Sequence, residues 1–254
     1  MNILRNVLVI LGIAYLGLLA ILFLKQRSFL YFPSHEDSRR LGAAAGLTPW
    51  FDGDSYLGMK REPKAGGRIW LFSHGNGGQA AGRGYAMRYF NANDGVYIVE
   101  YPGYGDQQGA PSEKGINAAV LKAYRTLGSQ FGTQNICVLG ESLGSGPASM
   151  LGSLSDPPRR IVLVVPYDRI TSVAQEKIPF APVGLLMRDR WDNLAALSNY
   201  KGRLDIWGAA HDQVIPVVHA RRLAQGLPQA KYHEINSGHG WADSGQVDLS
   251  EGGP

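Results

Sequence analysis

Ser142 stands between Gly140 and Gly144 in the stretch ICVLGESLGSG, directly after a run of residues with almost no polarity. The spacing G-x-S-x-G is typical of a nucleophile elbow, in which a serine sits on a strained turn and the glycines let neighbouring backbone pass. An ordinary turn of small residues is the alternative. Because the chain contains 33 glycines, the pattern alone is weak. The G-x-S-x-G pattern indicates a nucleophile elbow only if a strand precedes it and a helix follows it.

A serine hydroxyl becomes a good nucleophile only when a base takes its proton, and an acidic group must orient that base. His239 in EINSGHGW is the candidate base, with a surface loop histidine as the alternative. Asp212 in IWGAAHDQVIP is the candidate acid, although it could instead cap a helix or form an Asx turn. Asp168 also follows a predicted strand and is a rival acid. Asp212 fits the expected order serine, acid, histidine along the chain, and we favour it over Asp168.

An oxyanion hole requires backbone N–H groups aimed at the position where negative charge develops on a substrate carbonyl. One donor is expected from Leu143, the residue after the nucleophile, and the other from the loop after an early strand. FSHGNGG is that loop, and Asn76 is its expected donor. His74 at the start of the loop is interpreted as a support for it. Glu141 is interpreted as a solvated or hydrogen-bonded neighbour of the elbow rather than a catalyst.

The elements that must position these side chains are short apolar runs separated by helical stretches. The runs are too short for helices and rich in β-branched residues, as strands covered on both faces should be. They are 68–74, 96–101, 135–140, 160–166, 203–208 and 231–235. Helices are predicted from Ser112 to Phe131, after Ser142 and from Pro216 to Leu227. This alternation predicts an α/β fold with a mostly parallel sheet, whose strand ends collect the functional groups.

The composition excludes several classes of function. At 254 residues the chain suits one α/β domain, and neither an internal repeat nor a second domain is evident. A net charge of +4 without a basic stripe argues against nucleic-acid binding. Neither a metal-ligand spacing, a P-loop nor G-x-G-x-x-G is present, so we expect no metal and no cofactor. Cys137 is the only cysteine, which excludes an intrachain disulfide.

The N-terminus carries VLVILGIAYLGLLAILFL, from Val7 to Leu24, without a charge. As a helix it would be about 27 Å long, close to the thickness of the bilayer hydrocarbon. The chain continues KQRSFLYFP rather than with small residues, which favours an uncleaved anchor over a removed signal peptide. We therefore expect an anchor over residues 1–27 and a catalytic domain over 28–254. Basic residues after the span favour a cytoplasmic domain, and we expect residues 244–254 to form a polar, frayed tail.

Several further motifs resemble those of the α/β-hydrolase family and, more narrowly, of its membrane-anchored hydrolases of the bud-emergence-suppressor type. These are LYFP, HGNGG, YPGYGDQQGAPSE, GESLG, WGAAHDQVIP and SGHGW, and the resemblance covers nearly everything after residue 28. It implies Ser142, Asp212 and His239 as the catalytic triad. Two departures are QAAGRGY after the HGNGG loop and one extra residue in GAAHD. Ser rather than Asp at the elbow argues against dehalogenase or epoxide-hydrolase chemistry.

Only 37 residues separate Pro166 from Leu204, which predicts a small flap and an open site. The flap carries the apolar residues Phe180 and Leu185–Met187. They could line an acyl pocket, but we interpret them as packing a helix onto the sheet. We expect a membrane-anchored serine hydrolase of carboxylic esters or thioesters, acting on a small or lipid-like acyl ester or an acylated protein. An acyltransferase, a serine peptidase and a non-catalytic scaffold of the same fold are the alternatives.

Overall fold

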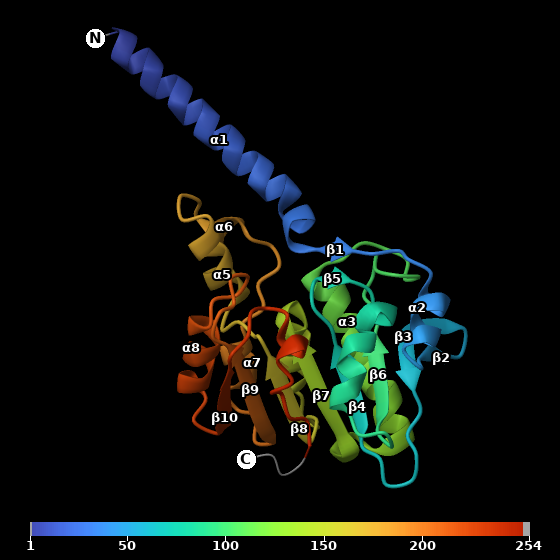
Figure 1. Cartoon of the computed structure of the whole chain (residues 1–254). Helices are drawn as coiled ribbons and strands as arrows, with labels where there is room; N and C mark the ends of the chain where they lie inside the picture. Colours follow the sequence, from blue (N-terminus) through green and yellow to red (C-terminus); the bar gives the residue numbers. More distant parts are fainter. Residues whose placement is uncertain (1, 251–254) are drawn as a thin grey trace.

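A computed structural model describes residues 2–250 of the chain (Figure 1). Its centre is an eight-stranded sheet in the order β10-β9-β8-β7-β4-β6-β3-β2. The pairs from β10 to β6 are all parallel, whereas β3 pairs antiparallel with both β6 and β2. The α/β class and the mostly parallel sheet predicted from the sequence are therefore confirmed.

The six predicted strands are all present within two residues of their expected ends. They are β4 (Ile69–Ser73), β6 (Gly95–Val99), β7 (Ile136–Glu141), β8 (Arg160–Val164), β9 (Arg203–Ala209) and β10 (Ala230–Ile235). The structure adds two strands that were not predicted, the antiparallel pair β2 (Thr48–Asp52) and β3 (Ser55–Arg61) at the sheet edge. Both strands are partly exposed, so they lack the continuous apolar run that marks a buried strand. The structure also adds β1 (Phe32–Pro33) and β5 (Gly77–Gly78), which pair with each other.

The sheet separates two hydrophobic clusters, because successive side chains of a strand point to opposite faces. In β4, Leu71 faces one cluster and Trp70 faces the other. The first cluster packs under α3 (Glu113–Phe131), α4 (Ser145–Leu151) and α8 (Val218–Gly226). The second is covered by α2 (Ser38–Ala44) and by the 3-10 segments η1 (Ala80–Tyr89) and η4 (Trp241–Ser244). The predicted long helices thus gather on one face.

Helix α3 begins where the sequence predicts it. The Ser112 side chain accepts a hydrogen bond from the backbone N–H of Gly115, which caps the first turn. The apolar stripe predicted for this helix is buried against the sheet from Ile116 to Leu127. A further short 3-10 segment, η2 (Thr133–Asn135), then leads directly into β7. Helix α3 therefore directly precedes β7, the strand that ends at Glu141, one residue before Ser142.

The segment between β8 and β9 forms a small cap of three short helices. They are α5 (Ile170–Lys177), α6 (Val183–Leu186) and α7 (Asn193–Leu197). Phe180 and Leu185 are 53% and 81% exposed, so the expected packing of this apolar cluster onto the sheet is wrong for these two residues. The cap is instead stabilised by loop contacts such as the hydrogen bonds from Asn193 to Ser145 and to the Tyr167 carbonyl.

The expectation of a frayed C-terminal tail is also wrong over the part that the structure describes. Val247 and Leu249 are buried in the second cluster. The buried guanidinium of Arg160 donates to the Leu249 carbonyl at 2.8 Å and to the Asp205 carboxylate at 2.7 Å. The tail thus supplies an acceptor that this buried arginine needs. Residues 251–254 of the predicted tail lie outside the described residues.

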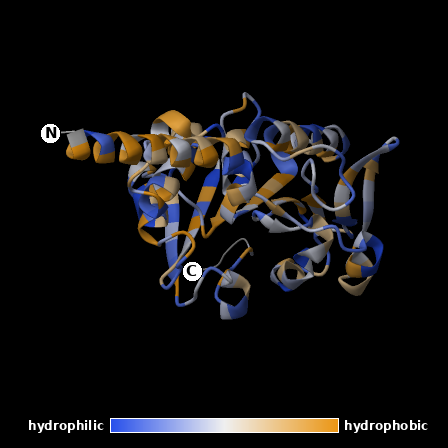
Figure 2. Cartoon of the chain, turned by 90° about the horizontal axis from the view of Figure 1, so that it is seen from above, coloured by the Kyte–Doolittle hydropathy of each residue, from blue (hydrophilic) through white to orange (hydrophobic). Residues whose placement is uncertain are grey.

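The N-terminal apolar run forms one long helix, α1 (Asn2–Leu30), so it continues three residues past the expected boundary at residue 27. It projects away from the sheet in Figure 1 and is apolar along most of its length in Figure 2. Its length and composition are sufficient to cross a membrane, and its apolar window is exposed. Its last turns pack against the rest of the protein, and Tyr15, near the middle of the helix, donates a hydrogen bond from its hydroxyl to the Phe180 carbonyl.

Candidate active site

Ser142 lies on a sharp turn between β7 and α4. Its φ angle is +51°, a left-handed conformation that costs a non-glycine residue about 1–2 kcal/mol. The serine opens a short 3-10 turn, η3 (Ser142–Gly144), that leads into α4. A Cβ on Gly144 would collide with the backbone carbonyl of Ser73, so the position requires glycine. The local geometry matches the strained elbow expected from the G-x-S-x-G spacing.

His239 lies on the loop after β10, at hydrogen-bond distance from the serine. Its Nε2 is 3.0 Å from Ser142 Oγ, and its Nδ1 is 2.7 Å from Asp212 Oδ2. In the neutral ring, an Nδ1–H that donates to the carboxylate leaves Nε2 as an acceptor for the serine hydroxyl. The histidine side chain is 26% exposed, whereas the Asp212 side chain is 1% exposed. The structure therefore brings these three side chains into one hydrogen-bonded chain.

Asp212 occupies two roles that the sequence offered as alternatives. Its Oδ1 accepts hydrogen bonds from the backbone N–H groups of Val214 and Ile215, at 2.8 and 2.9 Å. This Asx-type turn holds the carboxylate rigid and leaves Oδ2 for His239. Asp168, the rival acid, contacts a different histidine, with 2.7 Å between its Oδ1 and His219 Nδ1. The acid that reaches His239 is therefore Asp212.

The two expected oxyanion donors, Leu143 and Asn76, line the same cavity as Ser142. The loop that carries Asn76 is tightly held: its side-chain amide donates to the Leu30 carbonyl at 2.9 Å, and its own carbonyl accepts from Phe32 N–H and Tyr104 OH. Among residues 2–250 no acceptor is found for the backbone N–H of Asn76.

His74 supports the loop from below and does not line the cavity. It is fully buried and stacks on the Tyr101 ring at a centroid distance of 4.1 Å. Burial, together with the nearby Arg83 charge, lowers the pKa of His74 to about 3, so the ring is neutral at pH 7. Glu141 accepts a hydrogen bond from Tyr85 OH at 2.7 Å. Both residues act as structural neighbours, in agreement with the interpretation from the sequence.

A cavity of about 560 Å³ opens beside Ser142. Its walls come from cap helices α5 and α6, from the loop after β9 and from the last turns of α1. Most lining residues are apolar, and the polar ones are Gln26, Asn76, Ser142 and Lys177. The sequence analysis missed the contribution of α1, because an apolar run looks the same whether it faces lipid or closes a cavity. Leu186 and Met187 of the cap also line this cavity.

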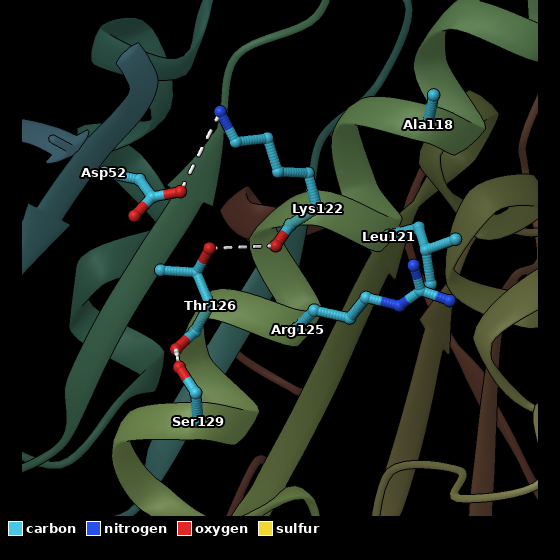
Figure 3. A pocket seen from close by; sticks show the side chains of 7 residues that line it. All are labelled: Asp52, Ala118, Leu121, Lys122, Arg125, Thr126 and Ser129. Carbon is cyan, nitrogen blue, oxygen red and sulfur yellow. Dashed lines mark hydrogen bonds and ion pairs between the residues drawn. The ribbon is translucent and has the colours of Figure 1, made fainter. Parts of the chain in front are cut away.

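A second depression of about 580 Å³ lies on the surface of helix α3, and Figure 3 shows its lining side chains. Lys122 forms an ion pair with Asp52 at 3.8 Å, and the Thr126 and Ser129 hydroxyls donate to backbone carbonyls of the same helix. The one carboxylate among the lining residues that the structure describes, Asp52, is paired with Lys122, and both hydroxyls are bonded to helix carbonyls.

Comparison with known proteins agrees with this architecture. An esterase of Pyrococcus furiosus superposes with a TM-score of 0.61 at 13% identity, over 83% of this chain and 90% of the esterase. This chain has the α/β-hydrolase fold. The elbow, the strand-end carboxylate and the late histidine occupy the positions at which this fold carries its active site.

The chain is also similar in sequence to several curated proteins. An uncharacterised protein of Mycobacterium tuberculosis is 25% identical over 262 residues, covering 95% of this chain and 89% of that protein. The lysophosphatidylserine lipase ABHD12 of Danio rerio is 30% identical over 145 residues, covering 50% of this chain and 38% of the lipase. No protein-family model matches the chain.

Proposed function

We propose that this chain is a membrane-anchored serine hydrolase that cleaves carboxylic ester or thioester bonds through an acyl-enzyme. The observation that carries the proposal is the continuous hydrogen-bonded chain from Asp212 through His239 to Ser142. Relatives in sequence and structure include a lipase and an esterase, which favours ester substrates with a lipid-like acyl group. Membership of the bud-emergence-suppressor type of anchored hydrolases belongs to the same proposal.

In the proposed reaction, Ser142 Oγ attacks the carbonyl carbon of the substrate while His239 Nε2 takes the serine proton. The negative charge that develops on the carbonyl oxygen is stabilised by the N–H groups of Leu143 and Asn76. The histidinium then protonates the leaving alcohol or thiol, and the carbon–oxygen or carbon–sulfur bond breaks. A water molecule, deprotonated by His239, attacks the acyl-enzyme and releases the carboxylic acid. Asp212 orients the imidazole and stabilises its charged form.

Labelling with a fluorophosphonate probe tests the nucleophile directly. Purified full-length protein should bind the probe covalently, and mass spectrometry should locate it on Ser142. The Ser142→Ala variant should not be labelled, while a matched Ser145→Ala variant, with its serine three residues along the turn, should be. Absence of labelling in the wild type, or labelling that survives Ser142→Ala, would favour a non-catalytic scaffold. Hydrolysis is separated from acyl transfer by supplying an alcohol acceptor and measuring the products.

The anchor is a second part of the proposal, and α1 supports it by its length and exposed apolar surface. Basic residues after the helix favour a catalytic domain on the cytoplasmic side. Extraction of membranes with alkaline carbonate should leave the full-length protein in the pellet. Full-length protein in the supernatant, or a product that mass spectrometry shows to lack α1, would remove the anchor from the proposal.

A further inference from the structure

The cavity beside Ser142 has an unusual wall, because part of it belongs to the same helix that is long enough to cross a membrane. Leu22, Gln26, Phe29 and Leu30 of α1 all line it. Residues three or four apart lie on one face of a helix, so these side chains form a single stripe directed at the catalytic domain. The other face of this part of the helix is exposed, with Leu24 at 69%. One helix thus presents apolar surface both outward and to the cavity.

Specific contacts hold this wall in place. The Asp189 carboxylate accepts hydrogen bonds from Arg27 Nε at 3.1 Å and from Tyr31 OH at 2.9 Å. Gln26 donates to the Leu186 carbonyl of the cap and accepts from the Arg188 N–H. The last turn of α1 is therefore a docked part of the catalytic domain, and it is expected to keep its position relative to Ser142.

The tip of the cap extends along α1 toward the middle of the apolar run. The hydroxyl of Tyr15 donates to the Phe180 carbonyl at 2.8 Å. Tyr15 and Gln26 are eleven residues apart, which corresponds to about 16 Å along the helix axis. Phe180 and Leu185 near this tip are largely exposed. If α1 spans a bilayer, these side chains lie within its hydrocarbon region.

We propose that the cavity binds the long acyl chain of a membrane lipid ester, which enters from the bilayer between α1 and the cap. The inference rests on the proposed hydrolase function and adds its substrate class and route of access. The cavity volume of about 560 Å³ lies in the range of small-molecule sites. An acyl chain leaving lipid would pass from one apolar environment to another. The exposed rim residues Phe29, Phe32 and Val214 would contact the acyl chain as it enters.

The same rim favours a lipid over an acylated protein. A protein substrate would bring peptide N–H and C=O groups to the cavity mouth, where exposed apolar side chains offer them no hydrogen bonds. A lipid places only its chain there, and its ester alone must reach the serine. The length of the acyl chain that is hydrolysed then depends on how much of the cavity is open beside α1.

The experiment compares p-nitrophenyl palmitate with p-nitrophenyl acetate, using full-length protein in phosphatidylcholine vesicles. The Leu22→Trp variant fills the far part of the cavity from α1, and the ratio of palmitate to acetate turnover should fall about tenfold. Leu24→Trp places the same side chain on the outward face and should keep the wild-type ratio. A wild-type ratio in Leu22→Trp, with the fluorophosphonate still labelling Ser142, would overturn the inference and leave the hydrolase function intact. Failure of labelling and of acetate hydrolysis in the wild type would overturn both.

A second pair of variants tests the route of access. Leu185→Asp puts a charge at the cap tip without touching the cavity lining. It should lower palmitate turnover in vesicles about tenfold relative to acetate turnover, because a charged group resists insertion into hydrocarbon. Phe51→Asp introduces the same charge at another exposed apolar residue, on strand β2 (Thr48–Asp52) at the sheet edge, and should change neither rate. Equal effects of the two variants would overturn access from the membrane. Faster turnover of an S-palmitoyl peptide than of palmitoylglycerol in the same vesicles would overturn the lipid assignment.

Discussion

The molecule contains two aspartate–histidine pairs with almost the same geometry and different surroundings. In each pair a carboxylate oxygen lies 2.7 Å from the Nδ1 of the histidine, in Asp212–His239 and in Asp168–His219. Both carboxylates follow parallel strands, β9 and β8. The difference lies at the other ring nitrogen. His239 Nε2 reaches the Ser142 hydroxyl, whereas His219 Nε2 lies 3.2 Å from a Glu176 carboxylate oxygen.

The two histidine side chains also differ in their exposure to solvent. The His239 side chain is 26% exposed, and the His219 side chain is fully buried. Burial lowers the pKa of His219, but its hydrogen bond to Asp168 and the charges of Asp168 and Glu176 outweigh this, so the pKa is raised. A histidine held between two carboxylates suits a stable imidazolium. A histidine between a carboxylate and a hydroxyl suits proton transfer. The aspartate–histidine contact alone therefore does not identify a catalytic site.

Removing the imidazole of each pair in turn should give the largest difference in activity between the two pairs. His239→Ala should lower kcat/KM for a soluble ester about 10⁵-fold, because the serine loses its base. His219→Ala should lower it less than about tenfold, because His219 has no contact with the nucleophile. Initial rates on p-nitrophenyl acetate, normalised to folded protein, measure both. A loss in His219→Ala that matches His239→Ala would contradict the assignment of roles.

Substituting the carboxylates should give a smaller difference in activity between the two pairs, with less change in side-chain volume. Asp212→Asn keeps an acceptor oxygen for the Asx turn but can fix the wrong tautomer of His239, so kcat should fall about 10⁴-fold. Asp168→Asn is the matched substitution in the other pair, and kcat should change less than about tenfold. The KM of both variants should stay close to the wild-type value, since neither carboxylate lines the cavity. If Asp168→Asn lost the greater activity, the acid would have to be reassigned.

Much of the candidate site could be predicted because its chemistry imposes an order on the chain. A serine nucleophile on a tight turn requires glycines at positions 140 and 144, and the base and acid must follow later strands. The choice between Asp168 and Asp212 could not be settled, since both follow parallel strands of the same sheet. It depends on which histidine each loop reaches, and that is a tertiary contact.

The parts of the fold that escaped prediction share one physical reason. Strands β2 and β3 lie at the sheet edge and are only partly buried, so their sequences lack a continuous apolar run. The tail around Leu249 is ordered by a buried arginine, Arg160, that is distant in sequence. The cavity wall on α1 depends on docking through Asp189. A local sequence pattern does not predict contacts with residues that are distant in the sequence.

Substitutions in the Asp168–His219 pair should reduce stability more than substitutions in the Asp212–His239 pair, the reverse of their expected effects on activity. Asp168→Ala leaves the buried His219 without its main partner, which should lower the free energy of unfolding by about 3 kcal/mol and Tm by about 6–12 °C. His239→Ala removes a partly exposed side chain from a loop and should cost less than about 1 kcal/mol. Thermal unfolding of the full-length variants in detergent measures both effects. Equal losses of stability in Asp168→Ala and His239→Ala would contradict a larger structural role for the Asp168–His219 pair.

The smallest expected effect is the dependence of stability on pH. Because the pKa of His219 is higher in the folded than in the unfolded state, its contribution is fully present below about pH 6.5 and is lost as pH rises through the folded pKa. Glu100 adds a similar decline, since burial raises its pKa to about 8. His219→Gln removes the contribution of His219 and keeps that of Glu100. The ion pair between Arg222 and Glu176 is present in the wild type and is expected to remain in the variant. The Tm difference between wild type and His219→Gln should therefore narrow as pH rises from about 6 to about 9. A constant difference would mean that His219 is already neutral between its two carboxylates.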